Sequence, residues 1–335
     1  MWECAHTDEP ESRRAFIKDG ICWIRKKRKE QPWSSRWWWW CPKSGPDWLI
    51  NGSTFSSGIV YLVNPPTLQS HPCLFLFLYS YSDIQSTEYI LRTHTMGNTP
   101  LPPDSHINHA SSIQYWSSIS PDVNGMLGGY PQISRIDLRS SANFLAKLRR
   151  LVPSMPQSGA MLPRGVDCGA GIGRVTDGFL SRVCAVVDVV EPVENFARVI
   201  RENPALHVAD DNKGRVGDIF VTGLENWSPT ASYDLIWNQW CLGHLTDAQV
   251  VDYLVRCRES LTDSGLIVVK ENLSTNMEGD DIYDEVDSSV TRTDDKFRAL
   301  FDKAGLHMIR SENQSGFPKE LGLLPIRFYA LRPAS

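Results

Sequence analysis

The chain of 335 residues is long enough for one large or two ordinary domains, and 41% apolar residues are enough to build a core. A formal net charge of −5 argues against a protein that binds nucleic acid through its overall field, and it favours a basic partner. The longest apolar run among the first hundred residues, 73–79, is far short of the roughly 20 residues that span a bilayer. The acidic N-terminus also lacks the basic-then-apolar layout of a secretory signal. We therefore expect an intracellular protein, cytoplasmic or also nuclear, that binds neither nucleic acid nor a membrane.

Eight cysteines are distributed along the chain without a CxxC pair and without histidines at zinc-ligand spacing. This pattern favours reduced thiols that serve as packing residues. No metal site is predicted.

Residues 1–104 differ in composition from the remainder of the chain. They contain four adjacent tryptophans, Trp37 to Trp40, and no sustained hydrophobic period of a helix or a strand. Four adjacent tryptophans would place bulky rings on every face of a helix or strand. We predict a low-complexity or disordered extension, able to bind a partner, or untranslated sequence included by an error in the gene model, with Met96 as the true start. Residues 105–335 are predicted to form the folded domain.

The second part of the chain alternates short β-rich runs with helical patterns, which is typical of a doubly wound α/β sheet. The β-rich runs predict seven strands, at 165–168, 184–190, 216–221, 234–239, 265–270, 306–312 and 327–331. The clearest helix is predicted at 247–260, because Thr246 and Gln249 match a capping box. Ahead of the sheet, 111–116 and 141–151 are predicted helices that cover its open end.

A glycine-rich loop joins the first predicted strand to the following helix. Its glycines, Gly169, Gly171 and Gly173, allow a nucleotide-like ligand to approach the backbone closely. Arg174 stands where a dinucleotide fingerprint requires a further glycine, which argues against NAD or FAD. An arginine beside a helix N-terminus suits a ligand with a carboxylate, such as the methionine part of S-adenosylmethionine.

Acidic and apolar residues after the next two strands extend this predicted cofactor site. Glu191 directly follows the strand at 184–190, where an acidic side chain accepts hydrogen bonds from both ribose hydroxyls of a nucleotide. Leu224 and Glu225 follow the third strand, where a contact to adenine is expected.

Five motifs carry a resemblance to a known family. They are NGMLGGY at 124–130, DCGAGIGR at 167–174, IWNQWCLGHL at 236–245, KEN at 270–272 and VDSS at 286–289. Together they resemble the eukaryotic protein N-terminal (alpha-N) methyltransferases, of fungal type, which methylate the α-amine of Xaa-Pro-Lys termini. The resemblance covers about residues 107–332 and implies a Rossmann-like class I S-adenosylmethionine-dependent methyltransferase fold with N-terminal helices covering the site. It also implies ribosomal proteins among the substrates.

Position by position, the resemblance implies a role for individual residues. The implied cofactor ligands are Gly169, Arg174, Glu191, Leu224 and Gln239, with Glu191 where an aspartate is more usual. The implied acceptor side comprises Trp116, Leu127, Trp240, His244, Asn272, Asp284, Asp287 and Ser289. The segment 316–325 departs from the family in length and has Gly322 where an aromatic residue is expected, although Glu320 and Leu321 match.

The chemistry of the acceptor residues agrees with these roles. An α-amine with a pKa of about 7.7 to 8.0 is mostly charged at neutral pH, whereas methyl transfer requires its lone pair. A carboxylate and an imidazole, here Asp287 and His244, can hold the cation and then take or relay its proton. Asn272 is expected to orient the peptide, Trp240 to stack on its proline, and Asp284 with Asp287 to attract a lysine at position three.

Two other functions remain open from the sequence alone. An enzyme of the same fold could methylate a small molecule or a side-chain nitrogen, because the cofactor half does not distinguish acceptors. A non-catalytic scaffold that binds the cofactor and regulates a partner is the second. A nicotinamide dehydrogenase is disfavoured by Arg174.

Overall fold

The computed structural model describes residues 14–18, 21–25, 101–157 and 159–334. The chain divides into two units, residues 1–100 and 101–335. Within the first, β1 (Arg14–Lys18) and β2 (Ile21–Arg25) form an antiparallel hairpin. The tryptophan run 37–40 and Met96 lie outside the described residues, and the interpretation of residues 1–104 as an extension stays a prediction.

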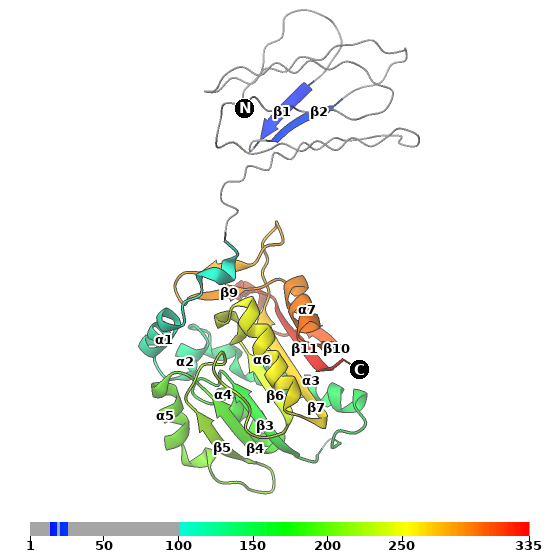
Figure 1. Cartoon of the computed structure of the whole chain (residues 1–335). Helices are drawn as coiled ribbons and strands as arrows, with labels where there is room; N and C mark the ends of the chain where they lie inside the picture. The colour runs from blue at the N-terminus through cyan, green and yellow to red at the C-terminus, as the bar shows by residue number, and fades with distance from the viewer. Residues whose placement is uncertain (1–13, 19–20, 26–100, 158, 335) are drawn as a thin grey trace, which may run out of the picture. The chain divides into compact units, whose positions relative to one another are not determined.

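The second unit is built around a seven-stranded sheet (Figure 1). Its strands are β3 (Leu162–Cys168), β4 (Cys184–Val190), β5 (Arg215–Phe220), β6 (Tyr233–Gln239), β7 (Leu261–Asn272), β10 (Leu306–Asn313) and β11 (Ile326–Pro333). The order across the sheet is β10-β11-β7-β6-β3-β4-β5; β11 is antiparallel to both neighbours and the other pairs are parallel. All seven predicted strands, and with them the α/β class, are confirmed.

Seven α-helices and six short 3-10 helices accompany the strands in the described residues. The α-helices are α1 (His109–Ser118), α2 (Val123–Met126), α3 (Ser134–Leu151), α4 (Arg174–Gly178), α5 (Glu194–Glu202), α6 (Asp247–Glu259) and α7 (Asp294–Lys303). The 3-10 helices are η1 (Pro103–His106), η2 (Pro131–Ile133), η3 (Leu180–Arg182), η4 (Pro204–Leu206), η5 (Leu242–His244) and η6 (Lys319–Leu321). No helix of the described part is long and apolar enough to cross a membrane.

The central strand β6 shows why the sheet has two helical layers. All of its residues are buried, as expected for a strand covered on both faces. Successive side chains point to opposite faces, so Ile236 packs in the core with α6 and α7, whereas Trp237 packs in the core with α3. The hydrophobic effect thus fixes which helix covers which face.

Local capping signals set the ends of two predicted helices. Thr246 and Gln249 form the predicted capping box at the start of α6. Asn108 is the N-cap residue of α1, and its side chain accepts a hydrogen bond from the backbone N–H of Ser111 at 3.1 Å. α3 begins at Ser134, earlier than the predicted 141; in this added part Asp137 is buried and Leu138 packs against a core cluster.

Between β7 and α7 the chain forms a hairpin that the sequence patterns did not predict. β8 (Ile282–Asp284) pairs with β9 (Ser289–Thr291), and the predicted acidic residues Asp284 to Asp287 occupy its end and turn. The strands are too short for a period of two to be recognised.

The strand order creates a crevice at one edge of the sheet. From β3 the chain proceeds to β4 and β5 on one side, whereas β6 and β7 lie on the other side of β3. Ligands of doubly wound sheets bind beyond the carboxyl ends of the strands at such a switch point. The glycine-rich loop follows β3, and Trp240 follows β6.

Candidate active site

A cavity of about 600 Å³ opens at this switch point, within the range of roughly 300–1,000 Å³ typical of small-molecule sites. Its walls come from the carboxyl ends of β3, β4, β6 and β7, from α1 and the segment 126–133, from the hairpin, and from the segment 321–326. The lining includes most of the predicted site residues: Trp116, Leu127, Gly169, Gly171, Arg174, Glu191, Leu224, Glu225, Gln239, Trp240, His244, Asn272, Asp287 and Ser289.

Two predicted site residues do not line the cavity. Gly173 has a φ of 78°, and a Cβ there would lie 3.0 Å from Cγ1 of Ile200, so this glycine lets α5 pack closely against the loop. Asp284 is exposed, and its Oδ1 accepts a hydrogen bond from the backbone N–H of Val286 at 2.8 Å. Gly173 thus packs beside Ile200 and Asp284 lies outside the cavity, and the functional roles of both residues stay predictions.

The other two glycines of the loop need their missing side chains. Gly169 and Gly171 have φ values of 68° and 58°, in the left-handed region that favours glycine. A Cβ on Gly169 would clash with Cβ of Cys241, and one on Gly171 would lie 2.7 Å from Sδ of Met126. The backbone thus approaches the cavity where no side chain fits.

Glu191 connects the loops that follow β3 and β4. Its side chain is buried, with Oε2 accepting from the N–H of Gly171 at 2.7 Å and Oε1 accepting from the N–H of Val193 at 2.8 Å. Burial raises the pKa of Glu191 to about 7, against the opposing effect of the two N–H donors. Each oxygen keeps a further acceptor position for a ligand hydroxyl.

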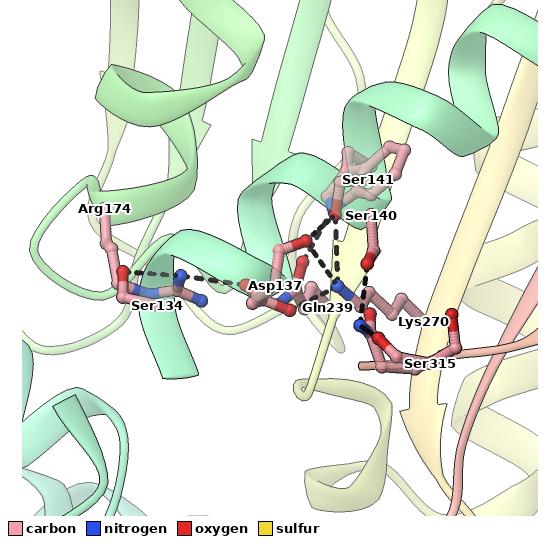
Figure 2. A network of polar contacts seen from close by, with 10 residues as sticks. Ser134, Asp137, Ser140, Ser141, Arg174, Gln239, Lys270 and Ser315 are labelled. Atoms are coloured by element: carbon pink, nitrogen blue, oxygen red, sulfur yellow. Dashed lines mark hydrogen bonds and ion pairs between the residues drawn. The ribbon is translucent and has the colours of Figure 1, made fainter. Parts of the chain in front are cut away.

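Arg174, Gln239 and Lys270 converge on Asp137, as Figure 2 shows. Nη1 of Arg174 donates to Oδ2 of Asp137 at 2.8 Å, and Nε2 of Gln239 donates to both carboxylate oxygens at 3.1 and 3.0 Å. Nζ of Lys270 forms an ion pair with Asp137 and donates to Oγ of Ser141 at 3.1 Å. The cluster holds Arg174 in place at the cavity wall.

The charges in this cluster favour an anionic ligand. Burial would raise the pKa of Asp137, but Lys270 and Arg174 outweigh it and keep that pKa below its usual value. Burial lowers the pKa of Lys270 to about 8, although Asp137 opposes the shift. Among the described residues, Arg174 donates only through Nη1. Its other N–H groups are available to a ligand carboxylate.

Asp137 and Lys270 were not predicted as site residues. The buried positions of α3 are Asp137, Ser141, Phe144, Leu145, Leu148 and Arg149. This spacing places Asp137 on the apolar face of the helix, and an acidic residue in such a row was the available signal.

At the opposite end of the cavity, His244 lies between two side chains of α1. Oγ of Ser112 is 2.8 Å from Nδ1 of His244, and Nε1 of Trp116 donates to Nε2 at 3.2 Å. Burial lowers the pKa of His244, against the opposing charge of Asp287. Trp116 therefore contacts the imidazole in addition to lining the cavity.

Two buried polar atoms of cavity-lining residues have no hydrogen-bond partner in the described part of the chain. They are Oδ1 of Asp287 and Nε1 of Trp240. Trp240 also has a φ of 55°, which is rare for a side chain of this size and costs roughly 1–3 kcal/mol. Unpartnered buried polar groups and backbone strain together mark a site for a polar ligand.

Backbone anchors that were not predicted hold the acceptor end in shape. Oε1 of Glu271 accepts from the N–H groups of Cys241 and Leu242 at 2.8 and 2.9 Å. Ser288, with a φ of 55°, accepts at Oγ from the N–H of Asn108 at 2.8 Å and thereby ties the hairpin turn to the start of α1. Burial raises the pKa of Glu271 to about 7. The described residues contain no group of three or more His, Cys, Asp or Glu that could hold a metal ion.

Residues 104–332 match the model of the AdoMet dependent proline di-methyltransferases. The alpha N-terminal protein methyltransferase 1 of Schizosaccharomyces pombe is 40% identical over 230 residues, which are 68% of this chain and 97% of that protein. The N-terminal Xaa-Pro-Lys N-methyltransferase 1 of Rattus norvegicus is 42% identical over 214 residues, 64% of this chain and 91% of that protein.

A solved SAM-dependent methyltransferase of Leishmania major has a TM-score of 0.57 and 33% identity, over 67% of this chain and 82% of that one. The resemblance inferred from the five motifs and the class I methyltransferase fold are thus confirmed. The chain belongs to the family of AdoMet-dependent proline di-methyltransferases.

Proposed function

We propose that this protein transfers methyl groups from S-adenosylmethionine to the free α-amine of proteins that begin Xaa-Pro-Lys. The observation that carries the proposal is the buried, unpartnered Oδ1 of Asp287 at the cavity wall. A buried carboxylate oxygen without a donor is costly, and a cationic amine would supply the missing donor. Two relatives that this chain covers over 97% and 91% of their length are named for N-terminal protein methylation.

The residues at the glycine-rich end fit the cofactor. Gly169 and Gly171 leave room for it, Arg174 offers free donors to its carboxylate, and Glu191 offers acceptors to its ribose hydroxyls. Leu224 and Glu225 line the wall where adenine is expected. When bound, the cofactor supplies a methyl group on a positively charged sulfur. Gln239 acts through Asp137, which it binds, and keeps Arg174 oriented.

The acceptor end then has to bind an ammonium group and free its lone pair. Asp287 binds the cation first and takes its proton afterwards, close to His244. Asn272, at the end of β7, presents an amide to the peptide backbone. Trp240 stacks on the proline ring, and its free N–H bonds a peptide carbonyl.

A lysine at the third position would reach the hairpin outside the cavity. Asp284 and Glu285 are exposed there. An exposed ion pair contributes about 0–1 kcal/mol, so these residues adjust selectivity more than they determine binding.

The test uses the full-length chain, S-adenosylmethionine and a hexapeptide beginning Pro-Pro-Lys, together with its N-acetylated twin. We expect the free peptide to gain one or more methyl masses and the acetylated peptide to gain none. If both gain mass, the acceptor is a side-chain nitrogen. If neither gains mass although the cofactor binds, a small-molecule acceptor or a scaffold role takes precedence.

Three finer points belong to the same proposal. Ribosomal proteins that expose Pro-Pro-Lys after loss of the initiator methionine are proposed substrates, in the cytoplasm. Residues 105–335 are proposed to form the complete catalytic domain, since the cavity-lining residues lie between His109 and Ile326. A chain that starts at Met96 is then expected to keep full activity on the hexapeptide, and a large loss would assign residues 1–95 a part in catalysis.

A further inference from the structure

The surroundings of His244 define which of its nitrogens carries a proton. An indole N–H only donates hydrogen bonds, so Nε2 of His244 must accept from Trp116 and cannot itself be protonated. The proton of the neutral ring is then on Nδ1, which donates to Oγ of Ser112. The two contacts together select one tautomer of the neutral imidazole.

Ser112 occupies a position that calls for an apolar residue. It is the one buried residue of α1, with 5% of its surface exposed. A buried hydroxyl is costly unless it is hydrogen-bonded, and the described contact of this hydroxyl is with His244. The hydroxyl is therefore explained by the orientation of the imidazole and not by the packing of the helix.

Protonation of His244 would disrupt this arrangement. In the imidazolium ion both nitrogens are donors, so Nε2–H would oppose the N–H of Trp116. Asp287 and the backbone of Ser288, both from the hairpin, favour the cation, whereas the neighbouring imidazole of His109 disfavours it. Burial also disfavours the cation. It is the largest influence on the pKa of His244 and lowers that pKa below its usual value.

We propose that Ser112 is a positioning residue that holds His244 as the neutral Nδ1–H tautomer, and that Asp287 alone receives the proton of the substrate amine. The proposal rests on the proposed function for its second half. The ammonium gives one proton to Oδ1 of Asp287. The freed lone pair forms the N–C bond while the C–S bond breaks and its electron pair stays on sulfur. The product nitrogen carries the positive charge, and the proton on Asp287 leaves to solvent.

The first half is tested without any peptide. In full-length protein with ¹⁵N-labelled histidine, the ring nitrogens of His244 report the tautomer, and a His244→Gln variant assigns the signals. We expect the neutral Nδ1–H form between pH 6 and 8. An Nε2–H form or an imidazolium at pH 7 would overturn the assignment, whether or not the protein methylates peptides.

Variants of Ser112 test the positioning role. Ser112→Ala is expected to lower kcat about fivefold, the equivalent of about 1 kcal/mol for one hydrogen bond, with little change in the peptide KM. An Nε2–H population should appear in the ¹⁵N spectrum. Ser112→Thr should restore kcat and the Nδ1–H form. Ser111→Ala, on the exposed side of the same helix, should change neither kcat nor the tautomer. Equal defects in the Ala and Thr variants, or none in either, would contradict the role.

The identity of the proton acceptor is tested by His244→Gln against Asp287→Asn. A glutamine amide offers a donor group and an acceptor group, as the neutral imidazole does, but cannot take the proton. We expect His244→Gln to keep kcat within about tenfold, while Asp287→Asn loses about 100-fold or more, the usual effect of removing an acid–base group. Equally large losses of kcat in the two variants would show that His244 takes part in accepting the proton. Absence of methylation in the wild-type protein would instead refute the proposed function and leave the tautomer result standing.

Discussion

Asp137 of α3 and Lys270 of β7 form an ion pair in which both side chains are fully buried. They are 133 positions apart in the chain, and Arg174 and Gln239 also bind Asp137. The pair therefore couples α3 to the sheet and to Arg174, which lines the cavity. Its loss should affect both stability and the site.

Asp137→Asn should be strongly destabilising, because it leaves Lys270 and Arg174 buried beside a neutral amide. Breaking a buried pair costs roughly 3–5 kcal/mol, and a decrease of this size is expected in the free energy of unfolding measured with urea. Lys147→Ala is the control, since its ion pair with Glu312 is 43% and 25% exposed and should contribute less than about 1 kcal/mol. Similar losses in both variants would refute the special role of the buried pair.

Gly169→Ala is expected to weaken cofactor binding at least tenfold. The new Cβ would clash with Cys241 and would occupy a left-handed backbone, which alone costs about 1–2 kcal/mol. Gly279→Ala is a matched control, because Gly279 has a φ of 77° but open space around its Cβ position. Isothermal titration with S-adenosylmethionine measures the Kd of both variants, and only Gly169→Ala should bind more weakly than wild type. Equal Kd values for Gly169→Ala and wild type would show that the loop does not approach the cofactor.

Asp287→Asn and Glu191→Ala should impair different steps. Asp287→Asn is expected to reduce methyl transfer severely and to leave the Kd of the cofactor within about twofold of wild type, because Asp287 lies at the acceptor end. Glu191→Ala is expected to raise that Kd first, because it removes the proposed acceptor of the ribose hydroxyls. Single-turnover rates and equilibrium titration measure the two effects. An equal loss of cofactor affinity in both variants would end this division of roles.

Cofactor affinity should depend on pH through Glu191. Burial raises the pKa of Glu191 to about 7 in the free protein, whereas the proposed contact with ribose hydroxyls favours the charged carboxylate. Cofactor binding is therefore expected to lower the pKa of Glu191 and to release a proton at low pH. The Kd of the cofactor should then increase as pH falls through 7. Between pH 8 and pH 6 the expected increase is about tenfold. Glu191→Gln should be weaker throughout and nearly flat over this range, and a wild-type-like slope in that variant would assign the titration to another group.

Some interactions of the site were accessible from sequence because they depend on neighbours in the chain. The glycine loop, the acid after β4 and the capping box of α6 each occupy a few consecutive residues. Two local effects set their geometry: the steric limits of the backbone, and the N–H groups at a helix start that have no partner within the helix. Gly173 has the same left-handed backbone geometry as Gly169 and Gly171, but its Cβ position faces Ile200 and it does not line the cavity.

The sequence by itself determined the seven strands, the glycine-rich switch-point loop and the family. Each of these depends on short runs of consecutive residues, whose hydrophobic pattern and loop chemistry can be recognised without the tertiary structure. Only the tertiary structure decided that Asp137 would meet Lys270, that Ser112 would meet His244 across 132 positions, and that the acidic segment would fold as a hairpin beside α1. Such contacts depend on how helices and strands pack around one core. No local pattern specifies which distant side chain a buried polar group will find.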